Sequence, residues 1–205
     1  PDGLAEACSR HGPGPEHYYR VRGLDPEKLD PLARAARTLF LNRTCFNGIF
    51  RVNSHGLFNV PYGDGHTCFP LAKEALLKAG TALRAAKLIC ADYSECLRQA
   101  RKNDFVYLDP PYDLPLGRGI IKYHRHGFGV EDQERVAQVM RVLDQRGCHV
   151  LASNADTPLV RRLYRGFELS SLRVVRQVGG GTRRRRVGEV LVRNYPAPPK
   201  APSRP

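Results

Sequence analysis

From residue 87 onward, the chain alternates short apolar runs with segments of helical periodicity. The runs that we expect to form strands in this part are 88–91, 105–108 and 149–154. Between them, residues 131–146 place apolar side chains at helical spacing. This alternation predicts an α/β fold with a mostly parallel sheet. Two last strands, over 172–178 and 187–195, predict a terminal hairpin whose final strand runs antiparallel to the others.

Residues 1–86 lack that rhythm and predict a separate, mostly helical unit that carries one hairpin. Within this unit, residues 1–26 are rich in Pro, Gly and His, and they predict a flexible lead-in. Asp30 followed by Pro31 is typical of a helix start, and apolar residues at helical spacing follow it. Short aromatic and β-branched runs separated by Asn-Gly and Gly predict loops and a hairpin over 42–66.

The charge balance favours an anionic partner. The 205 residues carry a net charge of +13, with a pI near 9.8, and such a field attracts polyanions, nucleic acid first among them. The alternative is that arginine is abundant here and only solvates the surface. No apolar stretch approaches the roughly 20 residues that a membrane helix needs, and no signal peptide opens the chain. We therefore expect a cytoplasmic protein with no membrane partner.

Six scattered cysteines without a C-x-x-C pair predict free thiols and no metal site. The composition of residues 196–205 predicts a disordered tail. The chain starts with Pro1 rather than methionine, which favours a fragment or a processed product.

The apolar run 105–108 predicts a buried parallel strand. The segment Asp109-Pro110-Pro111-Tyr112 directly follows this run and is the strongest chemical signal. Ligands of open α/β sheets bind at the carboxyl ends of the strands. The Asp109 carboxylate and the Pro110 carbonyl can accept hydrogen bonds from an exocyclic amine, and the Tyr112 ring can stack on a flat base. That set suits methylation of a base amino group. The simpler interpretation is a strand that ends in a proline turn with an ordinary turn aspartate.

The chain resembles the DNA adenine methylase (Dam-like) family of adenine-N6 methyltransferases, which use S-adenosyl-L-methionine. Several blocks follow the family's order and together span about residues 38–195; they are 41–48, 51–53, 58–63, 109–112, 123–124 with 128 and 132–133, 153–157, and 180–189. The resemblance implies a Rossmann-like S-adenosylmethionine-dependent methyltransferase fold without its N-terminal strands. Into it would be inserted a mostly helical DNA-recognition subdomain with a β-hairpin, over 1–86. Residues 87–195 would form the catalytic sheet domain.

The resemblance also implies roles for individual residues. The catalytic residues would be Asp109, Pro110, Pro111 and Tyr112, and the cofactor would be bound by Asp109, Asp92 and Tyr93. Phe46 resembles the wedge that fills the site vacated by a flipped base, Asn47 a base or phosphate contact, and Arg51 the reader of a guanine. The further DNA-binding residues that we expect are Asn42, Arg43, Ile49, Asn53 and Pro61, with Arg183 and Arg184 on backbone phosphates.

One part of the family pattern is missing. The family has a lysine-bearing segment and a glycine-rich loop of Phe-x-Gly-x-Gly type before the recognition hairpin, and no such sequence occurs here. The chain is then expected to be the carboxyl-terminal part of a longer enzyme, or a remnant that binds DNA without methylating it. In both cases we expect weak binding of S-adenosyl-L-methionine by this polypeptide alone.

Three other functions stay open on the sequence. A cytosine-N4 methyltransferase would use the same turn, because its acceptor is also an exocyclic amine. A non-catalytic DNA-binding module and an RNA-binding protein are the other two. The expected partners are double-stranded DNA, the missing N-terminal segment and a restriction endonuclease, and we expect the chain to be a monomer.

Overall fold

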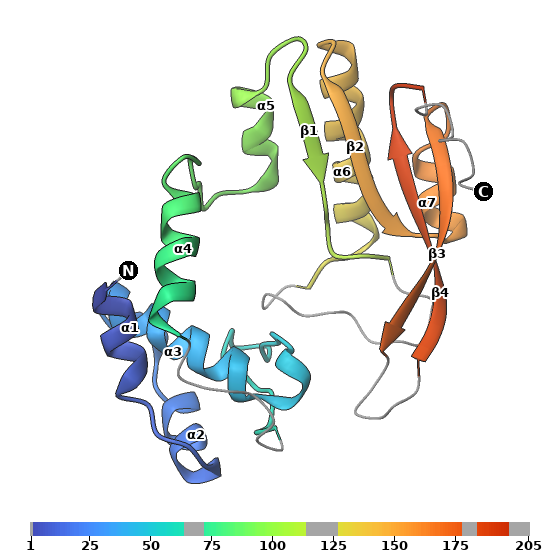
Figure 1. Ribbon diagram of the computed structural model, residues 1–205. Helices are drawn as coiled ribbons and strands as arrows, with labels where there is room; N and C mark the ends of the chain where they lie inside the picture. Colours follow the sequence, from blue (N-terminus) through green and yellow to red (C-terminus); the bar gives the residue numbers. More distant parts are fainter. Residues whose placement is uncertain (1, 64–71, 114–126, 178–183, 197–205) are drawn as a thin grey trace, which may run out of the picture. The chain divides into compact units, whose positions relative to one another are not determined.

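The computed structural model describes residues 2–63, 72–113, 127–177 and 184–196 (Figure 1). The described residues divide into two compact units. One holds the residues up to Cys90 together with Gly127, and the other holds the rest from Ala91 onward. Each unit has its own cluster of buried apolar side chains, so each is described by itself.

The first unit is mostly helical. Its elements are α1 (Asp2–Ser9), α2 (Pro15–Arg22), η1 (Pro26–Lys28), α3 (Pro31–Thr44), η2 (Phe46–Gly48) and α4 (Lys73–Leu83). The predicted helix start at Asp30 is confirmed, because its carboxylate accepts hydrogen bonds from the amides of Leu32 and Ala33 at 2.9 and 3.0 Å. This cap satisfies two of the amides that a helix leaves without partners at its start.

The expected flexible lead-in over 1–26 was wrong, since α1 and α2 lie there. The Tyr18 side chain is fully buried, and its hydroxyl donates a 2.8 Å hydrogen bond to the Val60 carbonyl. Arg37 of α3 donates to the carbonyls of Val21 and Arg22 at 3.1 and 2.8 Å. These contacts come from residues far along the chain, so the local composition of the segment did not indicate them.

The expected hairpin over 42–66 is present only as a pair of antiparallel bridges in the described residues up to 63. The bridges join Cys45 to Tyr62 and Val52 to Phe58. The apolar side of this loop completes the core of the first unit, whose buried members are Tyr18, Val21, Phe40, Leu41, Cys45, Phe58 and Val60. The loop is therefore held by its apolar side chains more than by strand pairing.

The second unit is a four-stranded sheet with helices (Figure 1). Its strands are β1 (Phe105–Leu108), β2 (His149–Ala155), β3 (Glu168–Gln177) and β4 (Arg184–Arg193), in the order β1-β2-β4-β3. Its helical segments are η3 (Tyr93–Glu95), α5 (Cys96–Gln99), α6 (Val130–Gln145) and α7 (Pro158–Leu163). The pair β1 and β2 is parallel, whereas β4 is antiparallel to both of its neighbours.

The predicted α/β class and the antiparallel last strand are thus confirmed, but the sheet as described is mixed, not mostly parallel. The expected strand over 88–91 is wrong. This segment has no strand pairing, and Leu88 and Ile89 are 72% and 49% exposed. An apolar run indicates a strand only if a neighbour pairs with it, and the run itself does not contain that information.

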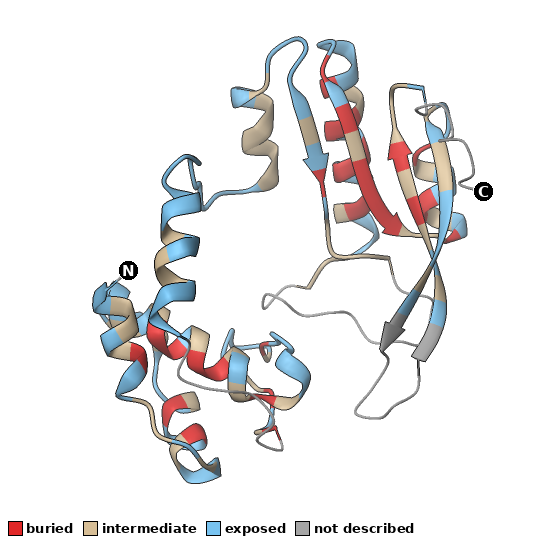
Figure 2. Ribbon diagram, viewed as in Figure 1, coloured by how far each residue is buried: buried red, intermediate tan, exposed pale blue. Residues whose placement is uncertain are grey.

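Helix α6 packs on the sheet through one apolar face (Figures 1 and 2). Its buried residues include Val136, Met140 and Leu143, at the spacing of one helix face. Strands β2 and β4 supply the buried partners Val150, Ala152, Val190 and Val192. Strand β1 lies at the edge of the described sheet, and its first residue, Phe105, is 59% exposed. The expectation of a buried strand there holds only for its last residue, Leu108.

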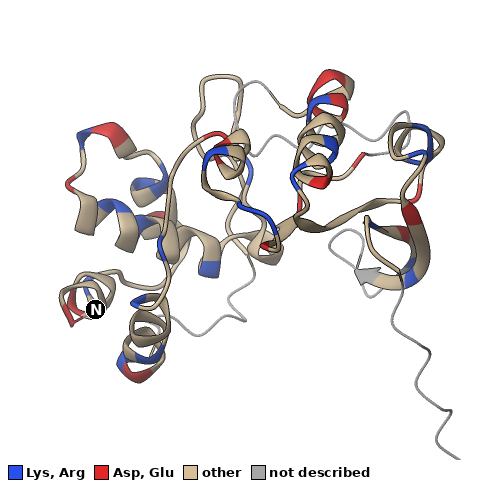
Figure 3. Ribbon diagram, turned by 90° about the horizontal axis from the view of Figure 1, so that it is seen from above, with Lys and Arg blue, Asp and Glu red and all other residues tan. Residues whose placement is uncertain are grey.

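Lys and Arg residues lie on helices and loops of both units (Figure 3). Among the described helices, none has both the length and the apolar character that crossing a membrane requires. The described cysteines are free thiols, in agreement with the sequence. No cluster of three or more His, Cys, Asp or Glu that could hold a metal occurs in the described part of the chain.

Candidate active site

Asp109 follows the last residue of β1, at the carboxyl end of that strand. The register pairs Leu108 with Ala152, so the next residues, Asp109 and Ser153, come side by side. The Ser153 hydroxyl donates a 2.6 Å hydrogen bond to Oδ1 of Asp109. The Tyr107 hydroxyl in turn donates to Ser153 at 3.0 Å. Two adjacent parallel strands therefore fix the Asp109 carboxylate at the rim of the sheet.

Tyr112 belongs to the same group of side chains. Burial raises the pKa of its phenol, a hydrogen bond with Ser153 offsets part of that rise, and the nearby carboxylates of Glu189 and Asp109 add to it. The ring is half-buried, so it combines a polar contact with an open surface. The first and last residues of the Asp-Pro-Pro-Tyr turn thus both lie near the Ser153 hydroxyl.

The middle of the turn is held from helix α6. Gln133 donates a 2.8 Å hydrogen bond from Nε2 to the carbonyl of Pro111. Its amide oxygen, Oε1, accepts a 2.9 Å hydrogen bond from Nδ2 of Asn154 on β2. The two side chains are 2% and 1% exposed, so water does not compete for these bonds. The buried carboxamides of Gln133 and Asn154 therefore fix the position of the turn relative to the sheet.

The end of the turn is anchored by a second pair of bonds. The amide of Asp113 donates to Oδ1 of Asn154 at 2.9 Å, and the hydroxyl of Thr157 donates to the carboxylate of Asp113 at 2.5 Å. The Thr157 hydroxyl oxygen also accepts a hydrogen bond from the amide of Val160, so it caps α7. The start of α7 and the end of the turn are thereby tied to the same side chain.

Among the described residues, two acceptors at this rim have no partner. Asp109 is exposed, and one of its carboxylate oxygens is taken by Ser153. Within the described residues the carbonyl of Pro110 accepts no hydrogen bond. A carboxylate oxygen and a carbonyl at adjacent residues can together receive the two N–H groups of an exocyclic amine. The arrangement can therefore bind and orient an amine, with acceptors whose positions are already fixed.

Asp92 and Tyr93 make different contacts from those expected of a cofactor site. Asp92 caps η3 through Ser94 and accepts a 2.6 Å hydrogen bond from Arg135 of α6. These bonds, that from Ser94 first, lower the pKa of the Asp92 carboxyl. The Arg135 guanidinium lies 5.0 Å from the centre of the Tyr93 ring. The premise that both residues follow a strand is wrong, and their part in cofactor binding stays a prediction.

The residues expected to contact DNA lie together on the loop of the first unit. Arg51 is exposed, and Asn59 holds it through a 2.8 Å bond to its Nε. Asn47 is exposed in the left-handed region at φ 56°. Phe46 is half-buried against the core, whereas Ile49 is 45% exposed. The loop thus presents Arg51 outward together with exposed apolar side chains, namely Ile49, Phe50 and Leu57.

The other residues expected to contact DNA differ in their surroundings. Asn42 donates to the carbonyl of Gly48, and Asn53 accepts the amides of its own turn, so both stabilise the loop itself. Arg43 and Pro61 are exposed. Arg183 lies outside the described residues, and Arg184 begins β4 with a side chain that is not described.

The sequence alone did not assign a function to the residues that hold the turn. These are Asp113, Gln133, Ser153, Asn154 and Thr157. A signal was available, because Ser153 and Asn154 are polar residues at the end of an apolar strand. Gln133 lies three residues before Val136 on the apolar face of α6. Polar side chains at buried positions require hydrogen-bond partners, so such residues indicate a polar contact next to the core.

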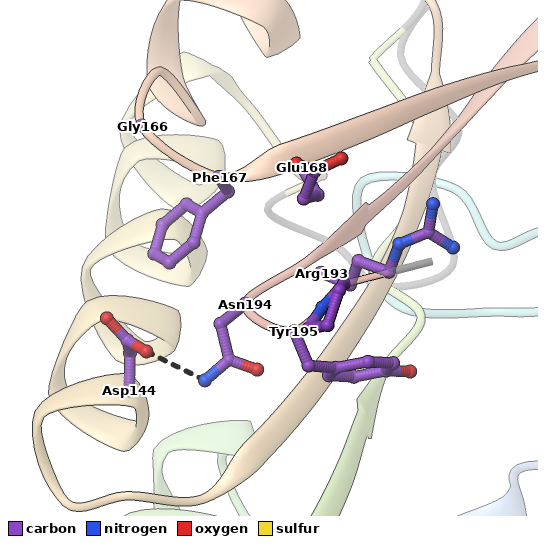
Figure 4. Close-up of a pocket in the computed structure, with 8 residues that line it drawn as sticks. Asp144, Gly166, Phe167, Glu168, Arg193, Asn194 and Tyr195 are labelled. Atoms are coloured by element: carbon purple, nitrogen blue, oxygen red, sulfur yellow. Dashed lines mark hydrogen bonds between the residues drawn. The ribbon is translucent and has the colours of Figure 1, made fainter. Parts of the chain in front are cut away.

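A separate cavity of about 280 Å³ lies away from this site (Figure 4). Phe167, Asn194 and Tyr195 line it, and Asn194 donates to Asp144 at 2.7 Å. Tyr195 packs against His149, the first residue of β2, with 5.9 Å between ring centroids. Asp109 is beside the other end of β2, so the cavity is not part of the turn.

The chain is similar to proteins of one family over most of its length. The family described as D12 class N6 adenine-specific DNA methyltransferase matches residues 4–178. A Type II methyltransferase of Lactococcus lactis subsp. cremoris is 33% identical over 95% of this chain and 72% of its own length. The DNA adenine methylases of Vibrio cholerae and of Escherichia coli K12 are 35% and 36% identical over 86% of this chain and 64% of their own length. The chain thus spans about two thirds of these relatives.

Proposed function

The chain belongs to the D12 class of N6 adenine-specific DNA methyltransferases, and from this premise we propose that it methylates adenine N6 in duplex DNA with S-adenosyl-L-methionine as methyl donor. The observation that carries the proposal is the pair of open acceptors at the carboxyl end of β1, the Asp109 carboxylate and the Pro110 carbonyl. Both belong to a turn that buried side chains fix in place.

Adenine N6 is a poor nucleophile, because its lone pair is delocalised into the ring. Hydrogen bonds from its N–H groups to Asp109 and to the Pro110 carbonyl localise that pair on nitrogen. S-adenosyl-L-methionine, when bound, would supply the methyl group that N6 accepts. The exposed carboxylate of Asp109 would take up the proton that N6 gives up and pass it to solvent. Positioning supplies most of the acceleration in such a transfer, and no covalent intermediate with the chain is required.

A base inside a duplex does not reach a turn at the rim of a sheet, so the adenine flips out. Unstacking costs a few kcal/mol. Stacking of the flipped base on Tyr112 returns about 1–3 kcal/mol. Phe46 of the first unit is the residue that we propose to fill the vacated place in the duplex.

Part of the cofactor fits the described residues. The methyl donor supplies an electrophilic methyl group on a positively charged sulfur, and the exposed carboxylate of Asp109 suits a cationic or hydroxyl-bearing neighbour. Asp92 and Tyr93 remain candidates for its adenine, although Arg135 competes for both. We propose that segments outside this chain complete the cofactor site, since the relatives are longer.

The remaining proposals concern the setting of the site. We propose that the mixed sheet is part of a Rossmann-like methyltransferase fold and that residues 1–86 form its DNA-recognition subdomain. In that subdomain Arg51 reads a guanine, while Arg183 and Arg184 neutralise phosphates. The expected state is a cytoplasmic monomer. A restriction endonuclease is the expected biological partner, because similar proteins include Type II methyltransferases.

The test compares Asp109→Asn with Asp104→Asn. Asp104 is an exposed carboxylate just before the same strand. Its Oδ2 accepts a hydrogen bond from the backbone amide of Arg101. Asp109→Asn should lower methyl incorporation into duplex DNA by roughly a hundredfold or more, while DNA affinity stays within a few-fold. Asp104→Asn should leave both unchanged. An Asp109→Asn protein with normal activity would contradict the proposal.

Nucleoside analysis of the methylated DNA separates the alternatives. N6-methyladenine supports the proposal, whereas N4-methylcytosine would replace it with the cytosine enzyme. DNA binding that survives Asp109→Asn, without methylation by the wild-type chain under any condition, would indicate the non-catalytic remnant. Preferential binding of RNA over duplex DNA in competition would indicate an RNA-binding protein.

A further inference from the structure

We propose that Ser153 is a positioning residue for methyl transfer and that its hydroxyl fixes which oxygen of Asp109 faces the substrate amine. The inference rests on the proposed function and assigns a role within the same site. Ser153 lies on β2, 44 residues beyond Asp109, and makes the only hydrogen bond that reaches the Asp109 carboxylate within the described residues.

The hydroxyl of Ser153 acts both as a donor and as an acceptor. A serine hydroxyl has one donor and two acceptor sites. The donor goes to Oδ1 of Asp109 at 2.6 Å, and the hydroxyl of Tyr107 occupies an acceptor site at 3.0 Å. Because its proton is committed to Asp109, Ser153 gives that carboxylate a fixed direction.

The sheet itself sets this geometry. Tyr107 and Asp109 are two residues apart on β1 and its extension, so their side chains lie on the same face. The parallel register places Ser153 next to Asp109 on that face. Ser153 is 4% exposed, although Tyr107 above it is 52% exposed. A buried hydroxyl therefore supports an exposed carboxylate, and the support comes from a rigid strand.

An exposed aspartate without such a partner samples several rotamers. The bond from Ser153 to Oδ1 selects one of them and leaves the other oxygen, Oδ2, without a partner among the described residues. The two acceptors must act together on one amine, and small displacements of a reacting group reduce rates by large factors. Fixing Oδ1 through Ser153 leaves Oδ2 as the oxygen that receives the amine. This effect acts on turnover and not on the affinity for DNA.

A purely structural role makes a different prediction. If Ser153 only satisfied a buried hydroxyl in the core, its loss would lower stability and leave the turnover of the folded protein unchanged. The separation of kcat from KM and from thermal stability therefore distinguishes the two roles. Ser153→Thr keeps the hydroxyl and serves as the conservative rescue.

The chain offers a matched control in Ser170. Ser153 and Ser170 both pair with Leu191 of β4, so they occupy the same row of the sheet on two different strands. Neighbouring strands are about 4.8 Å apart, which puts Ser170 roughly 10 Å from Ser153. Ser170 accepts a hydrogen bond from Arg193 and has no bond to the turn. Ser170→Ala thus removes a strand hydroxyl without touching Asp109.

The experiment measures methyl transfer to duplex DNA, KM for DNA and thermal unfolding for the full chain and its variants. Ser153→Ala should lower kcat by roughly 10- to 100-fold, with KM for DNA within about twofold. Ser153→Thr and Ser170→Ala should keep kcat within about threefold of wild type. Wild-type kcat in Ser153→Ala would overturn the proposal. So would a folded Ser153→Thr protein that is as slow as Ser153→Ala.

Two further measurements keep the test decisive. If Ser153→Thr does not fold, Tyr107→Phe replaces it, because this change removes a bond to Ser153 at an exposed ring and should lower kcat by a smaller factor. If kcat is unchanged in both Tyr107→Phe and Ser153→Ala, the positioning role of Ser153 is overturned. If the wild-type chain transfers no methyl group even at high concentrations of the methyl donor, the proposed function fails for the isolated chain. The positioning claim is then decided by crystal structures, and an identical Asp109 rotamer in wild type and Ser153→Ala overturns it.

Discussion

The side-chain amide of Gln133 lies 2.8 Å from the carbonyl oxygen of Pro111, so a fully buried residue of helix α6 supports the middle of the turn after β1. The same amide group accepts a bond from Asn154. Helix, strand and turn therefore share one carboxamide, and changes at this position affect both stability and the site.

Replacing Gln133 by Leu should lower the free energy of unfolding by about 1–3 kcal/mol, because the Pro111 carbonyl and the Asn154 amide lose their partner inside the protein. Urea denaturation followed by circular dichroism measures this change. Gln138→Leu is the control, since Gln138 is an exposed residue of the same helix. Equal stabilities for the two variants would show that the buried bonds contribute nothing.

Replacing Arg37 by Met should destabilise the first unit. The guanidinium is 6% exposed and donates to the carbonyls of Val21 and Arg22 at the end of α2. The substitution leaves both carbonyls without that donor, at a cost of about 1–3 kcal/mol. Arg34→Met, at an exposed position of the same helix, should change stability by less than about 0.5 kcal/mol. Thermal unfolding of both variants decides the matter, and a stable Arg37→Met protein would refute the expectation.

The contribution of Asp156 to stability should depend on pH. The Arg161 guanidinium, which donates to both oxygens of Asp156 at 2.6 and 2.8 Å, holds the pKa of that carboxyl below its ordinary value of 3.8. A pKa that is lower in the folded state gives stability that is present above the unfolded pKa and is lost as the pH falls through the folded one.

Wild type should therefore be more stable than Asp156→Asn at pH 7, and the difference should shrink as the pH falls below 3.8. The pair is partly exposed, with Arg161 at 52%, so we expect a small difference that added salt reduces. Urea titrations from pH 7 to pH 3 measure it. A difference that grows toward low pH would contradict the sign.

Replacing Arg51 by Ala should relax sequence preference without unfolding the loop. Asn59 holds the Arg51 guanidinium in an exposed position, and a bidentate contact to guanine is worth about 1–3 kcal/mol of discrimination. Selection from randomised duplexes first gives the preferred site of the wild type. Competition binding then compares that site with single-base changes, with Arg34→Ala as control. Undiminished discrimination by Arg51→Ala would assign base reading to another residue.

The parts of the fold that were predictable from sequence depend on neighbours in the chain. Asp30-Pro31 and Thr157-Pro158 mark helix starts because their caps act within three residues. Strands β1 and β2 are recognisable as apolar runs with turn residues after them. The strand expected over 88–91 was wrong for the opposite reason, because an apolar run becomes a strand only if a strand from another part of the chain pairs with it.

The candidate site also combines a local sequence pattern with contacts between residues that are far apart in the sequence. The turn 109–112 is visible as a local pattern of acceptors and an aromatic ring. The helices of residues 1–26 are stabilised by Tyr18 and its bond to Val60, 42 residues away, and the support of the turn by Ser153 spans 44 residues. A single sequence shows that Ser153 and Gln133 are polar, but the pairing of strands and helices decides what they contact.

The long sequence separation inside the site also sets the order in which it can form during synthesis. Asp109 and Pro111 leave the ribosome well before Gln133, Ser153 and Thr157, which hold them. A nascent chain or truncated product that ends before residue 153 therefore contains the recognisable motif without the arrangement that orients it. The reactive geometry comes into being only when the downstream helix and strand have been made and have folded back onto the turn.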